Sequence, residues 1–163
     1  MMKFINILNE QEEDNEITTI VIGGMPSSQY GGHYMKKMWK EEFGIDAPSN
    51  VKFLNWEDDF ESYPNVNKIM GWSKGGKKLW KEINNPSYSF IGLIDPSTPQ
   101  VPKSKPPDKV KLVYNPNNWS LSRYKTYRPN LDELEKNGWG TVSSSNHFKI
   151  PKEFFRKYKD QIL

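Results

Sequence analysis

A serine with glycines two positions before and two positions after it is the feature of this sequence that most directly suggests chemistry. The segment Gly71-Trp72-Ser73-Lys74-Gly75 lies between a predicted strand at residues 66–70 and a predicted helix at residues 74–83. A serine at such a turn exposes its hydroxyl as a nucleophile, and the small flanking residues let neighbouring backbone approach. We therefore predict that Ser73 is a nucleophile. The amide of Lys74, at the start of the helix, is a predicted donor to a developing oxyanion.

The elements that must position this turn alternate between strands and helices. Residues 17–22 are β-branched throughout, as in a strand buried on both faces, and Gly23-Gly24 ends the run. Further strands are predicted at residues 51–54, 66–70, 88–94, 110–114 and 141–144, and helices at 34–43, 74–83, 129–136 and 151–162. This order predicts an α/β fold, a mainly parallel β-sheet flanked by helices, with the strands' carboxyl ends at one edge.

Length and composition limit the alternatives. The 163 residues fit a single domain over residues 1–163, with residues 1–16 as a peripheral N-terminal segment and 96–109 as a proline-rich loop. The net charge of +3 is mild and does not indicate a nucleic-acid partner. The absence of cysteine excludes disulfides, thiolate nucleophiles and cysteine-ligated zinc. No signal peptide or run of about 18 apolar residues is found, which favours a cytoplasmic protein without a transmembrane segment.

The chain resembles the α/β-hydrolase family, and in particular its pancreatic-type lipase branch. The resemblance is carried by the Ser73 motif and by residues 90–96, Phe-Ile-Gly-Leu-Ile-Asp-Pro, at the end of the next predicted strand. In that branch the catalytic acid follows the strand after the nucleophile, which implies Asp95 here. The commoner family position lies one strand later, where residues 114–118 contain no carboxylate. The resemblance covers residues 17–163 by order of elements, so it implies an abbreviated three-layer α/β-hydrolase-like domain.

The same resemblance implies the remaining catalytic groups. A histidine before the last helix completes the family's Ser-Asp-His order, and His147 occupies that position. The buried acid would hold the imidazole in the tautomer that deprotonates the serine. A second oxyanion donor comes from the loop after an early strand, which leaves the amide of Gly24 or that of Met25 as the candidate. No metal or organic cofactor is implied.

Plainer interpretations of these residues stay open. Ser73 is also a residue type that caps helices, Asp95 begins an Asp-Pro turn, and His147 fits an exposed loop position. Three further residues are candidates for lining a substrate pocket: Trp72, Tyr30 and His33. Aromatic residues in predicted loops, Trp56 among them, either line an apolar cleft or cap the core.

The leading hypothesis is a serine hydrolase that cleaves a carboxylic ester, or a thioester or amide, of a small-molecule or lipid-like substrate through an acyl-enzyme. The alternative is a non-catalytic structural or binding protein on the same scaffold, for example a viral or assembly component. Residues 71–77 also fit the start of a phosphate-binding loop, but Lys78 stands where that motif needs Ser or Thr. Nucleic-acid or anion binding by the lysines of residues 74–81 is a third hypothesis.

Overall fold

The computed structural model describes residues 14–97, 104–118 and 131–163. Six strands form one sheet in the order β2-β1-β3-β4-β5-β6, and every neighbouring pair is parallel. The strands are β1 (Thr19–Ile22), β2 (Val51–Leu54), β3 (Lys68–Trp72), β4 (Phe90–Ile94), β5 (Val110–Tyr114) and β6 (Thr141–Val142). The predicted α/β class with a mainly parallel sheet is thus confirmed, and the sheet is parallel throughout.

Helices and short 3-10 turns connect the strands. The helices are α2 (Ser27–Tyr30), α3 (Gly32–Phe43), α4 (Lys74–Lys77), α6 (Ile150–Lys157) and α7 (Lys159–Ile162), and residues 131–136 are also helical. The 3-10 turns are η1 (Phe60–Ser62), η2 (Trp80–Glu82) and η3 (Pro116–Asn118). Most of the predicted N-terminal segment 1–16 and the centre of the proline-rich loop 96–109 lie outside the described residues.

Two sequence predictions at the central turn need correction. The predicted strand 66–70 extends instead from Lys68 to Trp72, because Gly71 and Trp72 pair with Leu93 and Ile94 of β4. The single helix predicted over residues 74–83 is divided into α4 and η2. Two consecutive glycines follow Lys74, and each costs about 1 kcal/mol relative to alanine inside a helix.

The closing helix is also shorter than predicted. It begins at Ile150 and ends at Lys157, and Tyr158 separates it from α7. The ring of Phe154 in α6 packs against β4 at a position without a side chain, where a Cβ on Gly92 would lie 2.6 Å from Phe154 Cζ. Helix α6 is therefore anchored to the sheet through a buried aromatic side chain.

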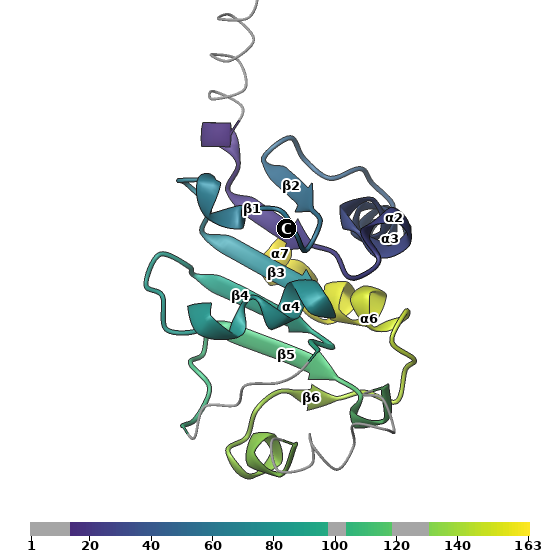
Figure 1. Ribbon diagram of the computed structural model, residues 1–163, viewed down its shortest axis with the longest axis vertical. Coiled ribbons are helices and arrows are strands. Elements are labelled where there is room, and N and C mark those ends of the chain that lie inside the picture. The colour runs from purple at the N-terminus through teal and green to yellow at the C-terminus, as the bar shows by residue number, and fades with distance from the viewer. Residues whose placement is uncertain (1–13, 98–103, 119–130) are drawn as a thin grey trace, which may run out of the picture.

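The sheet is the middle of three layers, as Figure 1 shows with α4 on its near face and α7 on its far face. Successive side chains along each strand point to opposite faces of the sheet, so each face has its own core. The core of one face joins the sheet to α4, η2 and residues 131–139 through Ile20, Ile22, Ile69, Ile91, Leu93, Leu112, Tyr114, Leu79, Trp80, Ile83, Leu131, Leu134 and Trp139. The core of the other face joins it to α3 and α6 through Val21, Met70, Trp72, Val113, Met35, Met38, Trp39, Ile150, Phe154 and Phe155.

The strand order fixes where a site is expected. The connection after β1 passes through α3 on one face, whereas the connection after β3 passes through α4 on the other. Neighbouring strands whose connections leave to opposite faces open a crevice at their carboxyl ends, where α/β proteins commonly bind ligands. The turns at the carboxyl ends of β1 and β3 contain Gly23-Gly24 and Ser73 respectively.

Candidate active site

The turn between β3 and α4 holds Ser73 in a backbone conformation that L residues rarely adopt. Its φ of 56° and ψ of −117° lie outside the common regions, and such a conformation costs on the order of 1–3 kcal/mol. The amide of Ser73 donates to the carbonyl of Ile94 (3.0 Å), and its carbonyl accepts from the amides of Lys77 (3.1 Å) and Ser97 (3.0 Å). The half-exposed side chain therefore projects from a fixed backbone, as a nucleophile at a strand-to-helix turn requires.

Glycines are needed at this turn because backbone packs directly on backbone. A Cβ on Gly71 would lie 2.5 Å from the carbonyl oxygen of Gly75, and a Cβ on Gly75 would lie 2.5 Å from that of Gly23. A Cβ on Gly24 would lie 3.1 Å from the Cβ of Ser73. The loop after β1 thus packs directly against the serine turn.

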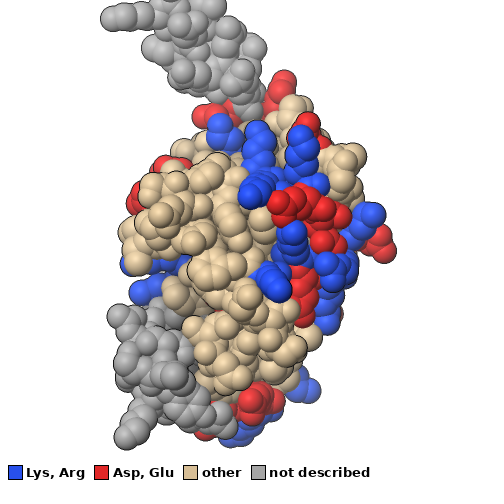
Figure 2. All heavy atoms as spheres, turned by 90° about the vertical axis from the view of Figure 1, so that its right-hand side faces the viewer, with Lys and Arg blue, Asp and Glu red and all other residues tan. Residues whose placement is uncertain are grey.

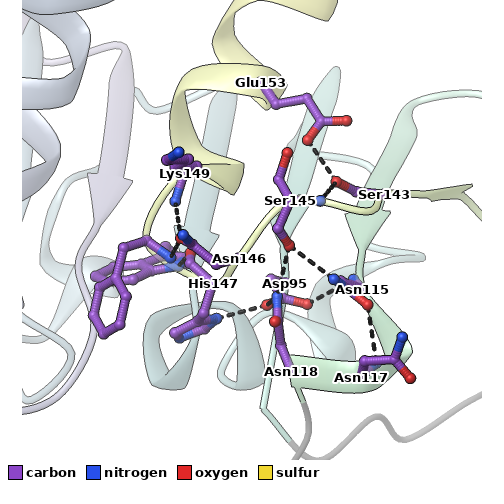
Figure 3. Close-up of polar contacts among 12 residues, drawn as sticks. Asp95, Asn115, Asn117, Asn118, Ser143, Ser145, Asn146, His147, Lys149 and Glu153 are labelled. Atoms are coloured by element: carbon purple, nitrogen blue, oxygen red, sulfur yellow. Dashed lines mark hydrogen bonds and ion pairs between the residues drawn. The ribbon is translucent and has the colours of Figure 1, made fainter.

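Asp95 follows β4 directly and is fully buried, with 0% of its surface exposed. Its Oδ1 accepts from the amide of Asn115 (3.0 Å), and its Oδ2 accepts from the side-chain amide of Asn118 (3.0 Å). The same Oδ2 lies 2.6 Å from Nδ1 of His147, as drawn in Figure 3. Each carboxylate oxygen therefore has a partner, which offsets the cost of burying the group.

The loop that carries His147 is held from the sheet side. The indole Nε1 of Trp72 donates to the carbonyl of His147 (3.1 Å), and the two rings lie 4.9 Å apart at an angle of 31°. The side-chain amides of Asn115 and Asn118 both donate to the carbonyl of Ser145, at 2.8 and 3.2 Å. The position of the imidazole is therefore set by β3, β4 and the segment after β5 together.

A second set of contacts ties the same loop to the closing helix. The hydroxyl of Ser143, a buried residue, donates to Oε2 of Glu153 in α6 (2.5 Å) and accepts from the amide of Ser145 (3.0 Å). Figure 3 shows this chain of contacts running from α6 toward Asp95. The loop is thus fixed at both ends before any substrate arrives.

The structure joins Asp95 to His147 and places Ser73 next to Trp72, whose ring packs on the imidazole. Within the described residues, the Ser73 hydroxyl makes no hydrogen bond to His147. The Asp95 contact engages Nδ1, so an Nδ1–H tautomer leaves Nε2 with its lone pair as the basic atom. The side chain of His147 is 28% exposed, so the imidazole can be reached from solvent.

The two candidates for the second oxyanion donor are distinguished by one hydrogen bond. The amide of Gly24 donates to the carbonyl of Tyr30 at 2.7 Å. No described residue accepts from the amide of Met25 or from that of Lys74. Met25 is also exposed, at 56%. The amide of Gly24 is therefore engaged within its own loop, whereas the amides of Met25 and Lys74 have no acceptor among the described residues.

Aromatic rings gather beside the imidazole. Tyr34 stacks on Trp72 with 5.0 Å between centroids, and Tyr30 lies 4.9 Å from Phe148. The Tyr34 hydroxyl donates to the carbonyl of Phe148 (2.9 Å). Burial raises the pKa of Tyr34 above its ordinary value, which keeps this hydroxyl protonated as a donor. Two of the three predicted pocket residues, Tyr30 and Trp72, belong to this aromatic group.

His33 does not join the other predicted site residues. It is exposed and lines a separate cavity of about 500 Å³ together with Asp14, Lys36 and Phe53. Its position at the second residue of α3 explains the difference, because Tyr34 turns toward the aromatic group while the preceding residue faces outward. The structure thus gives no support to His33 as a residue of the pocket at Ser73.

Four residues of the site were missed by the sequence analysis. Asn115 and Asn118 were noted only for lacking a carboxylate, although amide donors after a parallel strand are suited to hold an acid on the neighbouring one. Tyr34 was predicted only as the first residue of a helix, and Phe148 carried no signal beyond its place beside His147. The position of Asn115 just after β5 was the one available indication.

The surroundings of the site are mixed in character. Figure 2 views the side toward which the strands run in Figure 1, and shows a band of basic and acidic side chains beside a broad area with neither.

Within residues 14–97, 104–118 and 131–163, no group of three or more acidic or histidine residues could hold a metal ion. None of the helices in those ranges is long and apolar enough to span a bilayer. No protein-family model, curated protein or solved structure matches the chain.

Proposed function

We propose that the protein is a serine hydrolase of the α/β-hydrolase type that cleaves a carboxylic ester, and less readily a thioester or amide. The observation that carries the proposal is the 2.6 Å contact between buried Asp95 and His147, at the sheet edge where Ser73 occupies a strained strand-to-helix turn. A buried carboxylate on imidazole Nδ1 and a serine at such a turn are the parts of a catalytic triad. Their order along the chain is the one the family resemblance implies.

In the first half of the proposed reaction, Ser73 Oγ attacks the ester carbonyl carbon while Nε2 of His147 takes the hydroxyl proton. The carbonyl π electrons move to oxygen, which the amides of Lys74 and Met25 stabilise. When the tetrahedral intermediate collapses, the bond to the alcohol oxygen breaks. The alcohol leaves with the proton that His147 held, and the acyl group stays on Ser73.

In the second half, water replaces the alcohol. His147 takes a proton from the water as the water oxygen attacks the acyl carbon, and the bond to Ser73 Oγ breaks. The proton returns to Ser73, and the carboxylic acid is released. Asp95 keeps its charge throughout and stabilises the imidazolium that forms in each half. The Asn115 and Asn118 contacts hold the carboxylate in this role.

The mechanism requires the Ser73 hydroxyl to come within hydrogen-bond reach of His147. Rotation about the Cα–Cβ bond of Ser73 moves the hydroxyl without changing the backbone, and catalytic hydrogen bonds are often looser before substrate binds. The half-exposed position of Ser73 leaves room for this rotation.

The direct test is turnover of a p-nitrophenyl ester by the wild type and by Ser73→Ala. We expect the variant to lose about three to six powers of ten in kcat, since triad members act as a unit. Ser97→Ala, on a residue that contacts the turn through its backbone amide, is the matched control and should keep wild-type turnover. Equal turnover by wild type and Ser73→Ala would refute the assignment of the nucleophile.

A second candidate function is a binding or structural role without turnover. It is favoured by one observation, that the Ser73 hydroxyl and His147 are not hydrogen bonded in the structure. It predicts a folded protein that hydrolyses no ester and in which Ser73→Ala leaves partner binding intact. Ester hydrolysis that depends on Ser73 would exclude it.

A further inference from the structure

A groove of about 460 Å³ lies beside α4, next to the serine turn. It is lined by Trp56, Glu57, Lys74, Lys77, Lys78 and Lys81. Four lysine side chains and one glutamate side chain therefore line the groove beside an aromatic ring. Asp58, Asp59 and Glu61 are further carboxylates close to these lysines. Such a lining attracts anions and offers a flat apolar surface beside the charge.

The walls of the groove are held in place by specific contacts. Lys78 Nζ donates to the carbonyls of Trp56 (2.6 Å) and Asp58 (2.7 Å), which joins α4 to the loop after β2. Lys74 Nζ lies 4.6 Å from the centroid of the Trp56 ring. Lys78 therefore ties the Trp56 backbone to the end of α4, and Lys74 lies against the Trp56 ring.

The remaining lysines are available to a ligand. Lys77 is exposed, and its ammonium forms no ion pair with any residue in the described ranges. Lys81 lies 3.9 Å from Glu61, and both side chains are largely exposed. An exposed pair at this distance contributes little, about 0–1 kcal/mol, so a bound anion can compete for Lys81.

The groove adjoins both sides of the proposed oxyanion site. Lys74, whose side chain lines the groove, follows Ser73 in the chain and supplies one of the two amides. On the other side, Glu57 accepts a hydrogen bond from the hydroxyl of Ser27, two residues after Met25. A substrate attacked by Ser73 can therefore reach the groove with a short extension of its acyl or alcohol part.

We propose that this groove is a substrate subsite for an anionic group, a carboxylate or a phosphate, carried by the ester that Ser73 cleaves. The inference rests on the proposed hydrolase function and adds the class of substrate to it. The charged group lies between Lys77 and Lys81, and the neighbouring carbon skeleton lies on Trp56. The substrate is thus a small acidic ester rather than a neutral one.

The kinetic test compares two esters that differ in one charge. Mono-p-nitrophenyl glutarate carries a free carboxylate, and p-nitrophenyl butyrate is its neutral counterpart. For Lys77→Gln and for Lys81→Gln we expect KM for the glutarate ester to rise about twofold to fivefold for each lysine, the effect of an exposed charge pair. The KM for the butyrate ester and both kcat values should not change. Lys159→Gln, an exposed lysine of α7, is the control.

A binding test separates this subsite from the hydrolase proposal. Benzoate and phenyl phosphate are titrated by calorimetry into Ser73→Ala protein and into the same protein with Lys77→Gln and Lys81→Gln added, with benzyl alcohol as the neutral probe. Anion binding that the two lysine changes abolish supports the subsite even if no ester is hydrolysed. The relative affinities of the two anions distinguish carboxylate from phosphate.

Three results would overturn the subsite. The first is an unchanged KM for the glutarate ester in the double lysine variant of an active enzyme. The second is binding of benzyl alcohol as tight as that of the anions. The third is tight retention of single-stranded DNA with no binding of the small anions. Loss of all ester hydrolysis with anion binding intact would instead reject the hydrolase function alone.

Discussion

On the Asp95 side of the candidate site the side chains are held by hydrogen bonds, whereas on the Ser73 side the restraint lies in the backbone. Asp95 is fully buried and accepts from Asn115 and Asn118 while it contacts His147. Ser73 has a strained φ and ψ and three main-chain hydrogen bonds, but its hydroxyl does not bond to the imidazole. The Asp95–His147 pair is thus held in one arrangement, whereas the Ser73 hydroxyl has no hydrogen bond to the imidazole.

This difference has a physical reason. A buried carboxylate without partners would cost several kcal/mol, so its donors must be present in the resting protein. A serine hydroxyl at a half-exposed turn can hydrogen bond to water at little cost. Its orientation therefore does not have to be fixed by a protein partner. The strain of the turn, about 1–3 kcal/mol, is instead offset by the main-chain hydrogen bonds of Ser73 and by the close packing of the turn on the loop after β1.

Among substitutions that leave the Ser73 hydroxyl in place, the largest expected effect comes from Asp95. Asp95→Asn can still accept from the Asn115 amide, but it disturbs the tautomer of His147. We expect kcat for a p-nitrophenyl ester to fall by about three to four powers of ten, with little change in circular dichroism. Asp108→Asn, on an exposed carboxylate, is the control and should keep full activity. A variant of Asp95 that retains more than a tenth of the activity would contradict the role given to this residue.

The next largest effect, on both stability and activity, is expected from a substitution at the close backbone contact beside Ser73. In Gly75→Ala the new Cβ would lie 2.5 Å from the carbonyl oxygen of Gly23 and 2.7 Å from Ile22 Cγ2. Because backbone cannot move aside, we expect a loss of about 3 kcal/mol in unfolding free energy and a loss of activity in the protein that remains folded.

Gly44→Ala is the matched control for that variant. Gly44 has a φ of 70° but open space around it. Alanine there should cost about 1 kcal/mol and leave kcat unchanged. Urea denaturation gives the unfolding free energy of both variants, and ester turnover gives their kcat. A fully active Gly75→Ala protein would show that the close packing is not needed for catalysis.

A smaller effect is expected from Asn118, which supports Asp95 from outside the triad. Its side-chain amide donates to Asp95 Oδ2 and to the Ser145 carbonyl. Removing a donor to a charged group costs about 1.5–3 kcal/mol, so Asn118→Ala should lower kcat/KM about tenfold or more. The neighbouring exposed residue provides the comparison, since Asn117→Ala should have no effect on kcat/KM. Equal kcat/KM values for Asn118→Ala and Asn117→Ala would show that the Asn118 side chain does not support Asp95.

The smallest effect is expected at the aromatic group. Tyr34→Phe removes the hydrogen bond to the Phe148 carbonyl and should lower the unfolding free energy by about 0.5–1.5 kcal/mol at neutral pH. Burial raises the folded-state pKa of Tyr34 above the ordinary tyrosine value of 10.0, so the folded protein holds this proton more tightly than the unfolded chain. Its contribution to stability is therefore complete below pH 10 and falls as the pH rises further.

Urea denaturation at pH 8 and at pH 10.5 measures this contribution as the difference between wild type and Tyr34→Phe. We expect the difference to be smaller at the higher pH. A difference that stays constant, or grows, would show that the Tyr34 hydroxyl is not held in the folded state as described.

The fold could be predicted from the sequence where apolar runs define strands. The bounds of β2 and β5 agree with the prediction because both runs are framed by polar and turn residues. The end of β3 was placed two residues early, since Gly71 and Trp72 resemble the start of a turn and yet pair with β4. A local pattern cannot reveal pairing that depends on the neighbouring strand.

The candidate site could likewise be predicted only in part. Ser73 could be proposed from its place between a strand and a helix, and Asp95 and His147 from the resemblance to the α/β-hydrolase family. The amide donors to Asp95, and the choice between Gly24 and Met25, depend on single hydrogen bonds made across the fold. Such contacts follow from the exact register and packing of the elements, which residue spacing does not specify.

The most direct test of the central claim is labelling with a fluorophosphonate, followed by identification of the modified residue by mass spectrometry. We predict an adduct on Ser73 of the wild type, no adduct in Ser73→Ala, and greatly slowed labelling in His147→Ala because the base that activates the hydroxyl is gone. An adduct on another serine, or labelling of Ser73 at the same rate without His147, would contradict the account.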